Sequence, residues 1–289
     1  MVICHEVILR SQGLECRDES CDDSSSQIDV RSLDSCPLNL GAILKRTINS
    51  WIARNLGWSI ARNMTPNTDF RYSEKERRIL KGTHGRTMTP SNSIVNLIAA
   101  AEYISINQIE GAFVECGVWR GGSAMAFALS ILEDNTTVRE MFLYDTFEGF
   151  TDTMEEDFQI KDGKTAKHLF LKDRHYVCEA DLDDVREGLI STGYPLDRIK
   201  LVKGDVLDTI PLTLPESIAI LRLDTDYYES TIWELRHLFP LLSKGGVLII
   251  DDFDYWNGSR KACNEFFAEI GMADLLIRLE SGRMLVKRG

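Results

Sequence analysis

Beyond Phe113 the sequence alternates between short apolar runs and amphipathic stretches, and this alternation restricts the fold more than any other pattern in the chain. The apolar runs cover residues 113–116, 141–144, 200–202, 218–221 and 247–250. All but 200–202 are apolar on both alternating faces, as expected for strands covered by helices on both sides. Helical stretches follow at 123–132, 180–191, 230–242 and 260–270. The alternation predicts an α/β fold with a parallel, doubly wound sheet.

The end of the chain departs from this rhythm. Residues 275–279 and 284–286 have the composition of strands, and the turn Ser281-Gly282 lies between them. Two strands joined so tightly run antiparallel. We therefore expect a mostly parallel sheet that finishes with a C-terminal antiparallel hairpin. A charged and less patterned insertion at about 150–198 is expected to cover the active-site face.

The N-terminal part of the chain has a different character. Residues 1 to about 40 are polar and weakly patterned, which is typical of weak order. Between 38 and 56, apolar residues recur at helical spacing and predict an amphipathic helix that serves packing or homo-oligomer contacts. We divide the chain into an extension, 1–56, and a domain, 57–289. Within the domain, 71–81 and 91–105 have helical character and 82–90 a loop character.

Charge and composition exclude several classes of protein. The formal net charge of −12 argues against nucleic acid as a partner, because phosphate binding needs a basic face. No apolar run reaches the roughly 20 residues that span a bilayer, and the first residues lack the layout of a signal peptide. Four of the cysteines crowd beside His5, at Cys4, Cys16, Cys21 and Cys36, but their spacing matches no recurring zinc pattern. A cytoplasmic protein is the better interpretation.

A glycine-rich turn follows the first strand, in the segment 114–123. Glycines let the backbone approach a ligand closely, and Ser123 can cap the helix that follows. The spacing is Gly-x-x-x-Gly-Gly, which differs from the Gly-x-Gly-x-x-Gly of dinucleotide sites and disfavours a nicotinamide dehydrogenase. A cofactor site and a purely structural strand-to-helix turn both fit this segment alone.

Acidic residues close the next two strands. Asp145 ends the second strand, where such a residue binds ribose hydroxyls in nucleoside-binding sheets. Gly204-Asp205 follows the third strand, where the acid can accept from an adenine amino group or simply stabilise a turn. Together with the glycine turn, these features in order favour a nucleoside cofactor.

Carboxylates also end the fourth and fifth strands. Asp224 and Asp226 follow the fourth strand, and Asp251 and Asp252 follow the fifth. Adjacent parallel strands place these ends side by side, and crowded carboxylates need a cation or protons. Oxygen ligands without histidine suit Mg²⁺, Mn²⁺ or Ca²⁺. For Asp226 we favour a helix N-cap, and for the Asp251–Asp252 pair we favour metal ligation over capping.

At this point the chain resembles the macrocin O-methyltransferase family, from about Thr87 to the end. The resemblance rests on the segments 113–123, 145–149, 223–231 and 250–253. It implies a class I, Rossmann-like methyltransferase fold that binds S-adenosylmethionine (SAM), and a metal-dependent O-methyltransferase. The family methylates deoxysugar hydroxyls of macrolides and related antibiotics, so the resemblance implies antibiotic biosynthesis and a small-molecule acceptor, a sugar hydroxyl.

The resemblance also implies which residues form the site. The metal ligands of the family pattern correspond to Asp224, Asp251 and Asp252 of this chain. The SAM contacts of that pattern carry over to Thr89, Glu115, Gly117, Gly121, Gly122, Ser123, Asp145, Phe147, Gly204 and Asp205. The stretch 87–90 matches the family, but the chain departs from the pattern soon after Ser91, where an arginine is usual. Residues 1–56 match nothing in the family pattern, and this leaves the acceptor unidentified.

The expected reaction is direct displacement, in which an acceptor hydroxyl attacks the SAM methyl group. A divalent cation would lower the pKa of that hydroxyl, and Asp224 is the predicted general base. Because metal binding weakens a carboxylate as a base, water, His168 or His175 are alternatives for the proton. A catechol-type methyltransferase acting on an aromatic diol, and a non-catalytic scaffold that keeps the fold, are the rival functions.

Overall fold

The computed structural model describes residues 71–150, 153–172 and 178–288. The predicted weak order of residues 1–40 and the amphipathic helix at 38–56 lie outside the described residues. The homo-oligomer and the domain boundary at 56–57, which depend on that part of the chain, therefore stay predictions.

A single mixed sheet organises the described residues. Within them, seven strands lie in the order β3-β2-β1-β4-β5-β7-β6. Their bounds are β1 Ala112–Cys116, β2 Met141–Asp145, β3 Ile199–Lys203, β4 Ile218–Leu223, β5 Leu242–Ile250, β6 Ile277–Arg278 and β7 Arg283–Val286. Strands β1 to β5 pair in parallel, and β7 runs antiparallel to both β5 and β6. The predicted parallel sheet with a C-terminal antiparallel hairpin is confirmed.

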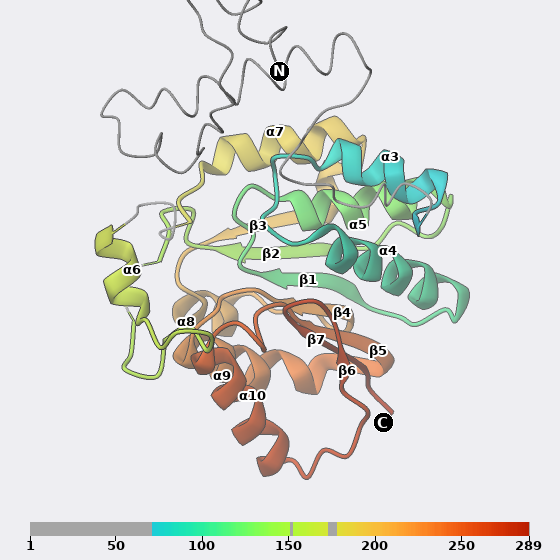
Figure 1. Cartoon of the computed structure of the whole chain (residues 1–289). Helices are drawn as coiled ribbons and strands as arrows, with labels where there is room; N and C mark the ends of the chain where they lie inside the picture. Colours follow the sequence, from blue (N-terminus) through green and yellow to red (C-terminus); the bar gives the residue numbers. More distant parts are fainter. Residues whose placement is uncertain (1–70, 151–152, 173–177, 289) are drawn as a thin grey trace, which may run out of the picture. The chain divides into compact units, whose positions relative to one another are not determined.

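Helices cover both faces of this sheet. Their bounds are α3 Glu74–Gly82, α4 Ser91–Ile106, α5 Gly122–Glu133, α6 Ala166–Lys172, α7 Leu182–Thr192, α8 Val206–Thr209, α9 Tyr228–Leu238 and α10 Asn257–Glu269. Figure 1 shows α4, α5 and α7 over one face and α8, α9 and α10 over the other. The helix predicted at 230–242 ends earlier, because Pro240 cannot continue an α-helix and a short 3-10 turn takes over.

The core consists of two layers, one on each side of the sheet. Successive strand residues point to opposite faces, so Phe113 and its register partner Met141 pack in one layer with α5. The next pair, Val114 and Phe142, packs in the other layer with α9 and α10. Because helices pack on both faces, the sheet is rigid. The carboxyl ends of its parallel strands are therefore held in fixed positions along one edge.

The predicted insertion contains α6 and α7, and Asp157 ties it to the rest of the fold. The buried Asp157 carboxylate accepts from the backbone N–H groups of Tyr228 (2.9 Å) and Met154 (2.7 Å). A side chain at Gly258 would overlap that carboxylate, so glycine is needed where the insertion meets α10. The insertion is thereby held against the start of α9.

Among the described residues, no helix is long and apolar enough to cross a lipid bilayer. The cytoplasmic location stays a prediction.

Candidate active site

A cavity of about 770 Å³ runs along the carboxyl ends of the strands. It lies where the strand order reverses between β1 and β4, which is the usual position of ligands in open α/β sheets. Its volume is large within the range of about 300–1,000 Å³ for ligand sites. Nine of the predicted site residues line it: Thr89, Gly117, Ser123, Asp145, Gly204, Asp205, Asp224, Asp251 and Asp252.

The glycine turn after β1 closes against the end of β4. Gly117 has a left-handed φ of 82°, and a Cβ atom there would overlap the backbone carbonyl of Asp224. Its N–H donates to the Tyr144 carbonyl (2.9 Å). Gly117 is therefore a glycine because two backbones meet there, and this contact places the turn at the centre of the sheet edge.

Asp145 holds the same turn from the end of β2. One carboxylate oxygen accepts from the backbone N–H groups of Val118 (2.7 Å) and Trp119 (2.8 Å), and the other accepts from Phe147 (2.7 Å). Trp119 is in the left-handed region, with φ 46°. Asp145 thus shapes the turn as well as facing the cavity, and its second oxygen retains capacity for another donor.

The remaining predicted cofactor residues lie behind the cavity wall. Gly122 packs against the backbone of Arg86, and Gly121 touches Val185. Phe147 is buried in the core layer that contains α5 and α7. Glu115 is fully buried within β1. Their contact with SAM stays a prediction, and the visible role of each is to support the turn that faces the cavity.

The turn after β3 adds a third polar element to this side. Gly204 has φ 137° and its N–H donates to the Asp145 carbonyl (3.0 Å). Asp205 is the N-cap of α8 and accepts from the Leu207 N–H (2.9 Å). The two expectations for Asp205 are compatible, because a carboxylate that caps a helix can also face the cavity.

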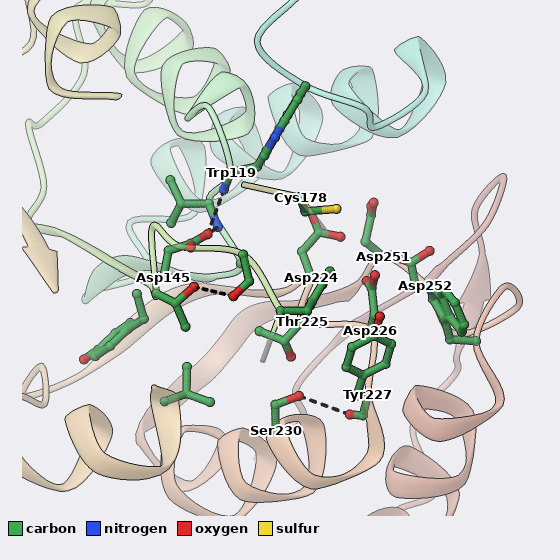
Figure 2. Close-up of a pocket in the computed structure, with 18 of the residues that line it drawn as sticks. Trp119, Asp145, Cys178, Asp224, Thr225, Asp226, Tyr227, Ser230, Asp251 and Asp252 are labelled. Carbon is green, nitrogen blue, oxygen red and sulfur yellow. Dashed lines mark hydrogen bonds between the residues drawn. The ribbon is translucent and has the colours of Figure 1, made fainter. Parts of the chain in front are cut away.

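Four carboxylates face one another at the other side of the cavity, as Figure 2 shows: Asp224, Asp226, Asp251 and Asp252. One oxygen from each of Asp224, Asp226 and Asp252 lies within 4.8 Å of the others. The expectation that Asp226 caps α9 is wrong, because the N-cap residue is Tyr227 and the first N–H of the helix, that of Tyr228, donates to Asp157. Asp226 instead has φ 69°, which turns its carboxylate toward the cluster.

Crowding and burial favour the protonated forms of Asp224, Asp226 and Asp252. Burial, reinforced by the charge of Asp224, raises the pKa of Asp226 to about 8. Burial also raises the pKa of Asp252 well above its ordinary value, with Asp226 and Asp251 adding to the effect. Asp224 is shifted in the same direction by burial, although the guanidinium of Arg222 opposes the shift. The cluster therefore holds protons near neutral pH unless a cation replaces them.

Arg222 is a buried cation beneath this cluster, and the sequence analysis did not select it. Its guanidinium bonds to Glu115 Oε1 (2.7 Å), Asp224 Oδ2 (2.8 Å) and Thr89 Oγ1 (2.7 Å), and pairs with Asp251 Oδ2 (3.1 Å). Glu115 is also its register partner in the sheet. The sequence did offer a signal for Arg222, namely a charged residue inside an otherwise apolar strand that helices cover on both faces. Such a charge needs buried partners.

Glu234 is a second buried acid that the sequence analysis missed. It lies on α9, is fully buried, and accepts a hydrogen bond from Thr225 Oγ1 (3.0 Å). Burial raises the pKa of Glu234 to about 8. Because Thr225 lies between Asp224 and Asp226, Glu234 fixes the turn that carries two of the clustered carboxylates.

Aromatic rings form the wall next to the carboxylates. Tyr227 contacts Phe150 (ring centroids 4.6 Å apart), Trp256 (5.4 Å) and Phe170 on α6 (6.2 Å). Burial raises the pKa of the Tyr227 phenol, so it keeps its proton. Of the two histidines considered for proton transfer, His168 is exposed on α6 and His175 lies outside the described residues.

The strand order with its antiparallel β7 is that of the class I methyltransferase fold. More specifically, the chain belongs to the macrocin-O-methyltransferase (TylF) family, whose model matches residues 47–285. The chain is accordingly a SAM-dependent O-methyltransferase, which confirms the predicted activity.

Characterised relatives agree with this assignment. The chain is 29% identical over 197 residues to demethyldecarbamoylnovobiocin O-methyltransferase of Streptomyces niveus, covering 68% of this chain and 73% of the relative. It is 29% identical over 194 residues to a tetracenomycin-C 4'-O-methyltransferase of Streptomyces olivaceus whose substrate name contains a dimethoxy-rhamnosyl group (67% and 72% covered). It is 27% identical over 239 residues to mycinamicin III 3''-O-methyltransferase of Micromonospora griseorubida (82% and 91% covered).

Solved structures share the fold. The O-methyltransferase NovP superimposes with a TM-score of 0.63 at 24% identity, covering 86% of this chain and 99% of that one. The calicheamicin methyltransferase CalS11 gives 0.55 at 19% identity, with 92% and 99% covered.

Proposed function

We propose that this enzyme methylates a sugar hydroxyl of a glycosylated natural product, and that it does so with a divalent cation bound at the ends of β4 and β5. The acceptor class is supported by the relatives whose names specify positions on sugars or sugar-bearing antibiotics. The single observation that carries the metal proposal is the group of Asp224, Asp226 and Asp252 carboxylates within 4.8 Å of one another at the cavity. Asp251 lies outside that group but lines the same cavity, and it is kept as a proposed ligand from the family pattern.

The proposed SAM side is the edge formed by β1, β2 and β3. The turn around Gly117, the Asp145 carboxylate and the Gly204–Asp205 turn all face the cavity there. Asp145 has capacity to accept from a ribose hydroxyl while it holds the turn. Thr89 lines the same cavity between this side and the carboxylates, so we keep it as a contact near the amino-acid end of SAM.

The residues present fit a hard divalent cation. Asp224, Asp251 and Asp252 are the proposed ligands, and each lines the cavity. Arg222 engages one oxygen of Asp224 and one of Asp251, which leaves each carboxylate a second oxygen. Oxygen-only donors are those that Mg²⁺, Mn²⁺ and Ca²⁺ prefer. When bound, the cation would neutralise the cluster and lower the pKa of an acceptor hydroxyl.

The proton of the acceptor hydroxyl needs a base within reach. Asp224 remains the proposed base, and Asp226 is a second candidate because its carboxylate faces the same cavity. Asp226 lines the cavity and lies within the carboxylate cluster. We therefore propose that one of these two acids receives the proton, with Asp224 as the first candidate.

The test is an acceptor screen with quantified release of S-adenosylhomocysteine. Purified full-length chain would be incubated with SAM and nitrophenyl glycosides of deoxysugars, or with catechols, with Mg²⁺ or with excess EDTA. The expected result is turnover of deoxysugar glycosides that EDTA abolishes and added Mg²⁺ restores. Calorimetry in EDTA should still detect SAM binding, because the SAM side lies over different strands.

Each alternative has its own outcome. Turnover of catechols alone would replace the sugar acceptor with an aromatic diol. Full activity in excess chelator would refute the metal proposal and leave the methyltransferase assignment standing. Binding of SAM without transfer to any acceptor in either panel would refute the acceptor class.

A further inference from the structure

Tyr227 is a buried phenol whose ring and hydroxyl have contrasting surroundings. The ring is packed among Phe150, Phe170 and Trp256, and the residue is 5% exposed. The hydroxyl oxygen is buried and has no hydrogen-bond partner within the part of the chain that the structure describes. Leaving a buried hydroxyl without a partner is unfavourable, so such a group calls for an explanation.

Two other buried tyrosines show the usual arrangement. Tyr194 accepts from the Arg139 N–H (2.8 Å) and donates to the Arg139 carbonyl (2.9 Å). Tyr144 donates to the carbonyl of Thr213. Both hydroxyls are satisfied by backbone away from the carboxylate cluster. Tyr227 differs because it is the one of these three that lines the cavity on the carboxylate side.

The hydroxyl of Tyr227 lies on the side of the ring that faces the cluster. Figure 2 shows Tyr227 next to Asp226, and the charges of Asp226 and Asp252 both act on its phenol. Nearby carboxylates favour an orientation in which the phenol donates its hydrogen bond rather than receiving one. The ring itself offers an apolar surface next to this donor.

We propose that Tyr227 positions the acceptor: its hydroxyl donates a hydrogen bond to an acceptor oxygen close to the reacting hydroxyl, and its ring packs against the apolar face of the acceptor sugar. This inference rests on the proposed function, whose acceptor class it refines to a ring that presents an oxygen beside the methylated position. The hydroxyl is covered without ligand, so binding includes a small rearrangement of the side chains over it, which is common when ligands bind.

The substitution that tests the proposal is Tyr227→Phe, which removes one oxygen and keeps the ring. With a nitrophenyl rhamnoside as probe, kcat/KM should fall about tenfold, mostly through a higher KM, which is the loss expected for one uncharged hydrogen bond. SAM affinity measured by calorimetry should be unchanged. Without acceptor, the melting temperature should stay the same or rise, because the variant no longer buries an unpartnered hydroxyl.

Tyr194→Phe is the matched control, since it removes a satisfied buried phenol outside the cavity. It should lower the melting temperature and leave kcat/KM unchanged. The two variants should change the melting temperature and kcat/KM in opposite patterns, and this difference separates substrate positioning from a structural role.

Specific outcomes would overturn the inference. An unchanged kcat/KM in Tyr227→Phe would refute it, and so would a lower melting temperature together with equal losses of SAM affinity and activity. If the wild-type enzyme turned over none of the glycoside probes, the proposed function would fail, and this inference would fail with it.

Discussion

The two sides of the cavity satisfy their polar groups in different ways. On the proposed SAM side, called the SAM side below, Asp145 and Asp205 accept hydrogen bonds from backbone N–H groups of the turns that they shape. On the carboxylate side, Asp224, Asp226 and Asp252 face one another across at most 4.8 Å, and burial and mutual repulsion raise the pKa of each.

This difference shows how far the fold alone organises each side before a ligand binds. The SAM side is preorganised, because its geometry follows from backbone contacts within the fold. The carboxylate side is incomplete, because its charges need protons or a cation to coexist. Changes on the first side should therefore affect stability and SAM affinity together, whereas changes on the second should affect catalysis much more than folding.

The largest effect is expected at Asp224. Asp224→Asn removes a charge from the proposed metal site and from one of the proposed bases, so kcat/KM should fall by about 100- to 10,000-fold. SAM affinity by calorimetry should remain close to wild type. Asp162→Asn is the control, because that exposed acid pairs with Lys164, does not line the cavity and should leave activity intact. A loss of SAM affinity as large as the loss of kcat/KM in Asp224→Asn would remove the distinction between the two sides.

A large effect on folding is expected at Gly117, on the SAM side. Gly117→Ala combines a left-handed φ of 82° with an overlap against the Asp224 backbone, so it should cost about 2–5 kcal/mol. Gly193→Ala is the control, since it has nearly the same φ, 79°, and open space around it; it should cost only about 1–2 kcal/mol. Chemical unfolding of both variants measures the difference, and equal losses would show that the close approach is unimportant.

The sequence predicted the fold well because the relevant signals are local and regular. Apolar runs at strand length, helical spacing and the tight turn at 281–282 each depend on neighbouring residues. Ends of elements were less predictable. The helix predicted from Ser230 begins at Tyr228, because the Asp157 carboxylate, distant in sequence, receives the first N–H of the helix.

The site was predictable only where a residue type and a strand end coincide. Asp145 ends β2, Asp224 follows β4 directly and Asp251 follows β5 directly, and parallel strands bring these ends together. Arg222 and Glu234 were missed, because their importance depends on burial and on partners that sequence spacing does not reveal. Asp226 was interpreted as a helix cap because an acid just before a helix usually caps it. Its left-handed backbone instead directs its carboxylate toward the other acids of the cluster.

A smaller effect, visible mainly in its pH dependence, is expected at Glu234, which holds the turn of the carboxylate side through Thr225. Its pKa is raised from 4.5 to about 8 in the folded chain, so the folded state binds a proton that the unfolded state releases. The stability that this acid contributes is complete below about pH 4.5 and is lost as the pH rises toward 8. Glu234→Gln mimics the protonated acid and should remove this contribution to the dependence of stability on pH. Melting temperatures of both proteins from pH 5 to about 8.5 would measure it, and parallel curves would contradict the assignment.

The smallest effect is expected at Asp205, where the SAM side combines capping with a predicted cofactor contact. Asp205→Ala removes the bond to the Leu207 N–H and should cost about 1 kcal/mol of stability. Asp205→Asn keeps an oxygen that can accept both that bond and a bond from an adenine amino group. It should therefore retain stability within about 0.5 kcal/mol and SAM affinity within about threefold. Chemical unfolding and calorimetry on the two variants would test this. If Asp205→Asn lost SAM binding while keeping its stability, the negative charge itself would be required, and this turn would resemble the carboxylate side more than the preorganised one.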